Sequence, residues 1–141
     1  MTHTIQILIA DDHPVVREGL AGMLAGQDDF EVVATVADGE AALEKFKKLS
    51  PDVVLMDLRM PILDGVGAIE AIKEVKPTAN IIVLTTYDSD ADIVRAIEAG
   101  ASGYLLKDTP REELFRAIRA ASTGESVLAP AVASRLMTRM R

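Results

Sequence analysis

The sequence contains no cysteine and no tryptophan, and aromatic residues make up only 4% of its 141 residues. Without cysteine the chain has no disulfide, no thiolate nucleophile and no cysteine-based metal site. No apolar run approaches the ~18 residues that a membrane-spanning helix needs. The first four residues offer no basic region before an apolar stretch, so we expect no signal peptide. These absences favour a globular protein of the cytoplasm.

An excess of positive charge is also missing. The formal net charge is −7, which argues against binding of nucleic acid by this chain alone. The charge is uneven, because residues 1–110 hold 9 Lys and Arg against 19 Asp and Glu, whereas residues 111–141 hold 6 Arg against 3 Glu. The length suits one domain with a real core. We expect this domain to span residues 1–124, followed by an appended segment, residues 125–141.

Five apolar, strand-like runs alternate with segments of helical period. The predicted strands are Ile5–Ala10, Phe30–Ala37, Val53–Met56, Asn80–Leu84 and Gly103–Leu106. The predicted helices start at Pro14, after a cap at Asp38, at Asp64-Gly65, after a cap within Asp88-Ser89-Asp90, and at Pro110 after a Thr109 cap. Leu49 and Val75 are expected on buried helix faces. Five β-α repeats predict an α/β protein with an open, doubly wound parallel sheet, since an eight-fold barrel needs nearly twice this length.

Polar side chains stand at four strand ends, where ligands bind in open parallel sheets. Asp11 and Asp12 follow the first strand, Asp57 the third, Thr85 the fourth and Lys107 the fifth. Each has an ordinary explanation: Asp12 caps the helix that begins at Pro14, Asp57 opens a turn, Thr85 is structural and Lys107 is a solvated charge. The combination is harder to explain in this way.

Three carboxylates at one edge repel each other, by roughly 4 kcal/mol per pair of charges ~4 Å apart at an effective dielectric constant of 20. Lys107 supplies one compensating charge and a divalent metal supplies the rest. Oxygen ligands of this kind suit Mg²⁺. A metal, a lysine and a hydroxyl around one aspartate form a phosphoryl-transfer site in which Asp57 is the nucleophile.

These residues resemble the receiver domain of two-component response regulators over residues 4–124. The resemblance rests on the acidic pair Asp11-Asp12, on Asp57 with Pro61 four and Gly65 eight residues later, on Thr85, and on Tyr104 with Lys107. The surrounding motifs are similar to the branch with a C-terminal LuxR-type helix-turn-helix DNA-binding domain, which is absent from this chain. The resemblance implies a three-layer, flavodoxin-like (βα)5 fold with strand order 2-1-3-4-5.

For the site, the resemblance implies that Asp57 accepts a phosphoryl group from a phosphohistidine of a sensor histidine kinase. Asp12, Asp57 and the backbone carbonyl of Arg59 are the implied Mg²⁺ ligands, with Asp11 acting through a metal-bound water. Lys107 pairs with a phosphoryl oxygen. The chain is then a phosphoacceptor that catalyses at most its own phosphorylation and dephosphorylation, and not an enzyme.

The resemblance also implies a switch. The Thr85 hydroxyl moves onto the phosphoryl group, and Tyr104 turns inward into the space that this leaves. Arg59, Thr86 and Tyr87 are expected to tune the lifetime of the phosphoryl group. The family often has proline after the lysine, where this chain has Asp108, so we expect no cis peptide there.

The tail, residues 125–141, is expected to lie outside the sheet. Pro130 restarts a helix with an apolar stripe, formed by Val132, Ala133, Leu136, Met137 and Met140. Arg135, Arg139 and Arg141 lie opposite or alongside it. This helix either docks on its own domain or is a linker or dimerisation helix that leads to a DNA-binding domain, and the resemblance favours the second interpretation. The alternative for the whole chain is a stand-alone receiver that acts only through protein contacts.

Two other classes of protein share parts of this pattern. An aspartyl-phosphate phosphatase carries a second acid two residues after its nucleophile, where this chain has Arg59. A flavin carrier of the same architecture needs a phosphate loop rich in glycine and hydroxyl groups after the first strand, where this chain has Asp11-Asp12-His13-Pro14. Both departures favour the signalling switch.

Overall fold

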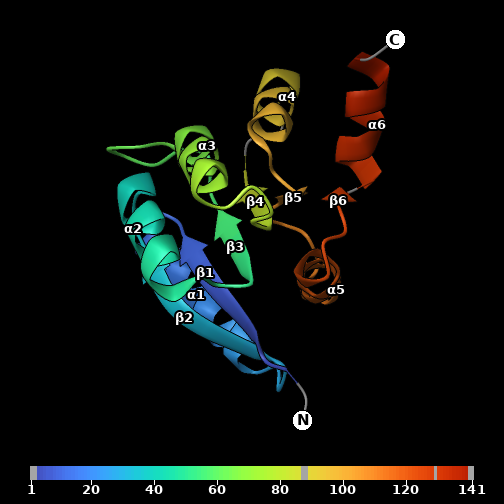
Figure 1. Cartoon of the computed structure of the whole chain (residues 1–141). Helices are drawn as coiled ribbons and strands as arrows, with labels where there is room; N and C mark the ends of the chain where they lie inside the picture. The colour runs from blue at the N-terminus through green and yellow to red at the C-terminus, as the bar shows by residue number, and fades with distance from the viewer. Residues whose placement is uncertain (1–2, 87–88, 129, 140–141) are drawn as a thin grey trace.

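The computed structural model describes residues 3–86, 89–128 and 130–139. Its centre is a parallel sheet with strand order β2-β1-β3-β4-β5-β6 (Figure 1). The strands are β1 Ile5–Ala10, β2 Phe30–Val36, β3 Val53–Met56, β4 Ile81–Thr85, β5 Gly103–Leu106 and β6 Val127–Leu128. The helices are α1 Pro14–Ala25, α2 Gly39–Leu49, α3 Gly65–Val75, α4 Asp90–Ala99, α5 Arg111–Ser122 and α6 Pro130–Arg139. The doubly wound parallel α/β fold is confirmed, and β6 extends the predicted order 2-1-3-4-5.

The alternation of side chains along each strand divides the core into two layers. Leu8, Val54, Met56, Ile81 and Val83 face one side, where they meet α2, α3 and α4. Their neighbours Ile7, Ile9, Leu55 and Ile82 face the other side, against α1 and α5. Because side chains alternate between faces with a period of two, strands this apolar can be buried on both sides. The result is the predicted three-layer arrangement (Figure 1).

The observed helix starts agree with the starts predicted from the sequence where a short polar side chain caps the first turn. Asp38, Asp64 and Ser89 each accept a hydrogen bond from the backbone N–H three residues later. The prediction was wrong by one residue at α5, whose cap is Pro110 and not Thr109. Pro110 is extended, with ψ of 141°, and the Thr109 N–H is taken up by a turn to the carbonyl of Leu106.

Two apolar residues expected to be buried are partly open to solvent. Leu49 is 38% exposed and Val75 is 48% exposed. Each is the last residue of its helix, and the buried face is completed one turn earlier by Phe46 in α2 and by Ile72 in α3. Periodicity alone did not show where the contact with the sheet stops.

The tail does contribute to the sheet, which corrects the expectation that residues 125–141 lie outside it. Val127 and Leu128 pair with Gly103 and Tyr104 of β5. This approach needs glycine at position 103, because a Cβ there would lie 2.4 Å from the Val127 carbonyl oxygen. A strand of two residues carries no periodic signal, so the sequence did not reveal it.

Helix α6 packs beside α4 (Figure 1). Val132 is buried in the core layer of α4, with Leu136 partly buried against it. Arg135 Nε lies 3.1 Å from Asp90 Oδ1 in the first turn of α4. The helix therefore docks on its own domain, while its role as a linker stays a prediction. Met140 and Arg141 lie outside the described residues, as does the side chain of Arg139. Within the described ranges, no helix is long and apolar enough to cross a membrane.

Arg119 links α5 to the residues just before β2. Its guanidinium bonds both carboxylate oxygens of Asp29, at 2.8 and 3.0 Å, and the side-chain oxygen of Gln27 at 3.0 Å. It also stacks 4.8 Å from the centre of the Phe30 ring. The hydrogen bonds from Arg119 hold the pKa of the Asp29 carboxyl below its usual value.

We predict that Arg119→Ala lowers the free energy of unfolding by about 1–2 kcal/mol, since an exposed ion pair and an exposed cation–π contact each contribute up to about 1 kcal/mol. Because the folded-state pKa of Asp29 is lowered, the ion-pair part is present above the ordinary Asp pKa and is lost as pH falls through the lowered value. Urea titrations at neutral and acidic pH measure this difference. Arg116→Ala, at an exposed position of the same helix, is the control. Equal losses for both variants, or a loss at Arg119 that does not shrink in acid, would contradict the prediction.

Candidate functional site

The polar residues predicted at the strand ends come together at one edge of the sheet. Asp11 follows β1 and Asp57 follows β3, and the preceding residues Ala10 and Met56 are paired in register. Thr85 is the last residue of β4, and the backbone N–H of Lys107 bonds its carbonyl oxygen at 2.9 Å. The parallel register therefore places these groups at the same level.

Lys107 is the cation that joins the two buried carboxylates. Its Nζ lies 2.7 Å from Asp11 Oδ2 and 3.0 Å from Asp57 Oδ2, and both aspartates are only 2% exposed. Burial on its own lowers the pKa of the Lys107 ammonium, but its hydrogen bonds to Asp11 and Asp57 outweigh burial and raise this pKa. Burial likewise raises the pKa of Asp11, and hydrogen bonds from Lys107 and from the His13 N–H outweigh it and lower this pKa. Both shifts favour the charged forms of Lys107 and Asp11.

A group of possible metal ligands surrounds this bridge. Asp11, Asp12, His13 and Asp57 each offer a ligand atom, and these atoms lie within 4.8 Å of one another. His13 Nδ1 lies 3.1 Å from Asp11 Oδ1 and also 3.1 Å from Asp12 Oδ1. Of these two contacts, only the one with Asp11 is a hydrogen bond. Asp12 Oδ1 is buried and has no hydrogen-bond partner among the described residues. A buried carboxylate oxygen that has no hydrogen-bond partner and lies beside two other acids fits a divalent cation with oxygen ligands.

The predicted cap at Asp12 is not formed. The residue that caps α1 is His13, without a side-chain hydrogen bond to the helix. Asp11 instead accepts a 2.8 Å bond from the His13 N–H, and its carbonyl accepts a bond of 2.8 Å from Arg17 Nη1. The Asp12 carboxylate is therefore left for the site.

Two glycines hold the loop that follows Asp57. A Cβ at Gly65 would lie 2.2 Å from the Asp57 carbonyl oxygen, and one at Gly39 would lie 2.2 Å from the Leu63 carbonyl oxygen. The loop also contains Ile62 at a φ of 71°, in the left-handed region, and this side chain is 77% exposed. Within the loop, the Leu58 N–H donates a 2.8 Å bond to Asp57 Oδ1. Close backbone contacts thus fix the direction of the Asp57 carboxylate.

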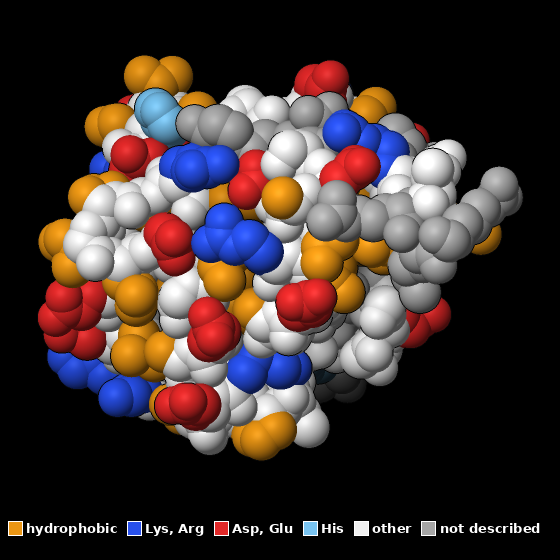
Figure 2. All heavy atoms as spheres, turned by 90° about the horizontal axis from the view of Figure 1, so that it is seen from above, with side chains coloured by type: hydrophobic (Ala, Val, Ile, Leu, Met, Phe, Trp, Pro, Cys, Tyr) orange, Lys and Arg blue, Asp and Glu red, His pale blue; other side chains and the backbone are white. Residues whose placement is uncertain are grey.

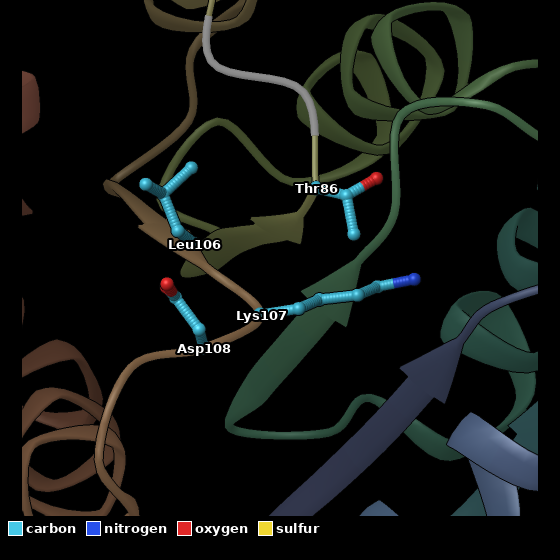
Figure 3. Close-up of a pocket in the computed structure, with 4 residues that line it drawn as sticks. All are labelled: Thr86, Leu106, Lys107 and Asp108. Carbon is cyan, nitrogen blue, oxygen red and sulfur yellow. The ribbon is translucent and has the colours of Figure 1, made fainter.

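Thr85 and Tyr104, the predicted switch residues, are both fully buried. Tyr104 already lies inward, in the core layer shared with α4. Thr86 is exposed and lines a hollow of about 280 Å³ with Leu106, Lys107 and Asp108. In Figure 3, Lys107 extends its amino group across the end of β3, whereas the Asp108 side chain points away from it. Tyr87, a predicted tuning residue, lies outside the described residues.

Arg59, also predicted to tune the site, reaches from the loop after β3 to α4. Its Nη2 lies 3.3 Å from both carboxylate oxygens of Asp92. Sequence reasoning missed Asp92, His13 and Arg17 as members of this neighbourhood. For Asp92 a signal existed, because a serine followed by an acid three residues later marks a capping box.

Comparison with known proteins identifies the family of this chain. The family model described as the response regulator receiver domain matches residues 7–119. The chain belongs to this family. The receiver is 41% identical over 133 residues to the transcriptional regulatory protein LnrK of Bacillus subtilis, covering 94% of this chain and 60% of that protein. It is 41% identical over 138 residues to the response regulator protein VraR of Staphylococcus aureus, covering 98% of this chain and 66% of that protein.

A solved structure is also similar over nearly the whole chain. The two-component response regulator of the LuxR family from Aurantimonas sp. SI85-9A1 superposes with a TM-score of 0.91 at 34% identity, covering 97% of this chain and 98% of that one. The chain is thus the receiver domain of a two-component response regulator, and its relatives include transcriptional regulators. It spans 60% and 66% of the length of the two curated relatives. Receiver domains bind Mg²⁺ in an acidic pocket, and the acidic cluster of this chain stands at that place.

We predict that Gly65→Ala lowers the free energy of unfolding by about 1–3 kcal/mol, the usual cost of forcing extra atoms into a packed region. The added Cβ meets backbone atoms of Asp57 and Leu58, which cannot rotate away as a flexible side chain can. Gly22→Ala is the matched control, because a Cβ at Gly22 meets nothing within 4 Å and the residue is helical. This control is expected to gain stability by about 0.5–1 kcal/mol. Urea unfolding of the two variants measures both changes, and a neutral Gly65→Ala would contradict the close approach.

Proposed function

We propose that this receiver is a phosphorylation-activated switch in which Asp57 accepts a phosphoryl group from a phosphohistidine of a sensor histidine kinase. The observation that carries the proposal is the buried Asp57 carboxylate, held 3.0 Å from Lys107 beside an acidic cluster in which one carboxylate oxygen has no hydrogen-bond partner. An Asp57 oxygen forms a bond to phosphorus as the bond from phosphorus to the donor imidazole breaks. The imidazole keeps the electron pair of that bond and takes up a proton.

The acidic cluster supports Mg²⁺ as the cofactor of this transfer. Asp12, Asp57 and the backbone carbonyl of Arg59 would hold the ion, with Asp11 acting through a bound water. The bound ion supplies charge stabilisation for the phosphoryl oxygens. The buried Asp12 oxygen supports this ligand set, since it lacks a hydrogen-bond partner in the described structure. Lys107 then pairs with a phosphoryl oxygen. This new pair replaces the contact between Lys107 and the Asp57 carboxylate, which weakens when Asp57 is phosphorylated.

Phosphorylation is reported to the surface through Thr85 and Tyr104. The Thr85 hydroxyl turns to the phosphoryl group, and Tyr104, which already lies inward, is held in that position by the new packing. Both side chains are buried, Thr85 at the end of β4 and Tyr104 in the core layer that includes α4, so a change in either alters the packing of α4, β5 and α5. Such a local change in charge that biases a packed element is a general form of switching. Arg59, Thr86 and Tyr87 tune the lifetime of the phosphoryl group.

The output is control of transcription through a DNA-binding domain that follows residues 125–141. The names of the relatives support this, since LnrK is a transcriptional regulatory protein. The receiver itself has a net charge of −7, and on the face in Figure 2 Lys and Arg side chains are interspersed with Asp and Glu. Binding to DNA is therefore assigned to the following domain. A homodimer is compatible with this output. The docking of α6 on α4 keeps a second candidate open, a receiver that acts through protein contacts alone.

We predict that acetyl phosphate with Mg²⁺ adds one phosphoryl group to the receiver and that Asp57→Asn abolishes this addition. The amide is a far poorer nucleophile than the carboxylate, and Lys107 keeps a hydrogen-bond acceptor. Intact-mass spectrometry detects the adduct. Asp28→Asn, at an exposed acid remote from the site, is the control and is expected to be modified like the wild type. Equal modification of the Asp57→Asn variant would exclude Asp57 as the acceptor.

We predict that Mg²⁺ raises the melting temperature of the wild type and that Asp12→Asn removes most of this rise. A ligand that binds only the folded state stabilises it by about 2.7 kcal/mol at a hundredfold excess over its Kd. Without Mg²⁺, the Asp12→Asn variant is expected to be at least as stable as the wild type, because one of three clustered negative charges is gone. Thermal melts with Mg²⁺ and with EDTA measure both effects. A full Mg²⁺ response in the variant would show that Asp12 is not a ligand.

A further inference from the structure

Asp92 is a buried carboxylate outside the phosphorylation site. Four polar or charged residues are buried in the described part of the chain, namely Asp11, Asp57, Thr85 and Asp92. The first three form the site, whereas Asp92 lies in the first turn of α4 and is 7% exposed. A buried charge is costly unless other groups compensate for it, so its partners indicate what it does.

Three side chains surround the Asp92 carboxylate. The Ser89 hydroxyl donates a 2.8 Å bond to Oδ2, and its oxygen accepts a 3.2 Å bond from the Asp92 N–H. Arg59 Nη2 lies 3.3 Å from both oxygens. Arg95 Nη1 lies 3.9 Å from Oδ1. The contact with Ser89 belongs to the start of the helix, but the contact with Arg59 crosses to the loop that carries Asp57.

The role of a helix cap does not explain the Arg59 contact. Ser89 is the cap residue, and its hydroxyl oxygen accepts the bond from the Asp92 N–H without help from the Asp92 carboxylate. In a capping box, the acid three residues after the cap reaches back to the backbone N–H of the cap residue. Here the carboxylate bonds the serine hydroxyl and the guanidinium of a residue 33 positions earlier. Asp92 therefore helps to hold the charge of Arg59, two residues after the phosphoacceptor, at the start of α4.

We propose that Asp92 is a positioning residue that controls the lifetime of the phosphoryl group on Asp57. Asp92 holds the Arg59 guanidinium at α4, and the phosphoryl group competes with Asp92 for that guanidinium. This inference rests on the proposed function. A phosphoryl group on Asp57 carries close to two negative charges and three acceptor oxygens, which arginine binds more strongly than one carboxylate. The Arg59 side chain is 56% exposed, so it can turn from Asp92 to the phosphoryl group without leaving a buried position.

The competition has a direction. A guanidinium that lies over the phosphoryl group pairs with its oxygens and covers the face from which water attacks phosphorus. Neutralising Asp92 weakens its hold on Arg59 and shifts the guanidinium towards the phosphoryl group. Hydrolysis of the acyl phosphate, in which a water oxygen bonds phosphorus and the Asp57 oxygen leaves with its electron pair, then slows. In the wild type, the contact of Asp92 with Arg59 keeps the guanidinium at α4, so hydrolysis is faster than in a variant without that carboxylate.

The test is the half-life of the phosphorylated receiver. The wild type and each variant are labelled with radioactive acetyl phosphate and Mg²⁺, freed of donor by desalting, and followed in Mg²⁺ buffer. We expect Asp92→Asn to lengthen the half-life about threefold to tenfold, which is up to about 1.4 kcal/mol in the barrier. Asp92→Glu keeps the charge and is expected to restore a half-life within about twofold of the wild type.

The matched control is Asp90→Asn. Asp90 lies in the same helical turn but pairs with Arg135 of α6. The half-life of the phosphorylated Asp90→Asn variant is therefore expected to equal that of the wild type. The decisive comparison uses Arg59→Ala as the background. If Asp92 acts through Arg59, adding Asp92→Asn to Arg59→Ala leaves the half-life unchanged, because the side chain that Asp92 positions is gone.

Several outcomes would overturn the proposal. One is an Asp92→Asn half-life equal to that of the wild type, and another is the same lengthening in the Arg59→Ala background, which would assign the effect to the structure of α4. Melting curves show whether each variant is folded. Asp92→Ser, whose hydroxyl can still accept a hydrogen bond, is the neutral variant to use if Asp92→Asn unfolds. A wild type that takes up no phosphoryl group would overturn the proposed function and this inference together, so the two failures are distinguishable.

Discussion

The Lys107 ammonium between Asp11 and Asp57 is the interaction on which the rest of the site depends. Two carboxylates that are almost completely buried at neighbouring strand ends cannot both stay charged without a cation between them. Lys107 meets this need at 2.7 and 3.0 Å. It can do so only because the parallel register carries β5 to the same edge as β1 and β3, with the Lys107 N–H bonded to Thr85. The sheet is thus organised so that one positive charge reaches two negative ones, and removing a single partner from such a buried group costs several kcal/mol.

Much of this arrangement could be predicted from the sequence, because it depends on local patterns. Apolar runs of four to eight residues marked the first five strands. Caps at Asp38, Asp64 and Ser89 marked three helix starts. The topology then brought the strand-end residues together without any knowledge of side-chain contacts. What failed were features without a local pattern: the two-residue β6, the one-residue shift at Pro110, and the exposure of Leu49 and Val75 at helix ends. Their positions depend on where neighbouring elements stop.

The site shows the same division. Asp11, Asp12, Asp57, Thr85 and Lys107 were found because strand ends and residue spacing are visible in the sequence. His13, Arg17 and Asp92 were missed because their contacts join groups whose geometry no periodicity describes. Arg17 binds a backbone carbonyl, and nothing in its residue type distinguishes it from a solvated arginine on a helix. Asp92 did carry a capping pattern, which explains its bond to Ser89 but gives no reason to expect Arg59 as a second partner.

The first turn of α4 contacts two segments that lie far apart in the sequence, the loop after β3 and helix α6. Asp92 pairs with Arg59 in the loop after the phosphoacceptor strand, and Asp90 pairs with Arg135 of α6. Both carboxylates lie in the first turn of α4, where the positive end of the helix dipole stabilises negative charge. If the phosphoryl group draws Arg59 away from Asp92, the change occurs within one helical turn of the contact that holds the tail helix. The two pairs have no side chain in common, so the contact of α6 with α4 and the contact of the Asp57 loop with α4 can change independently.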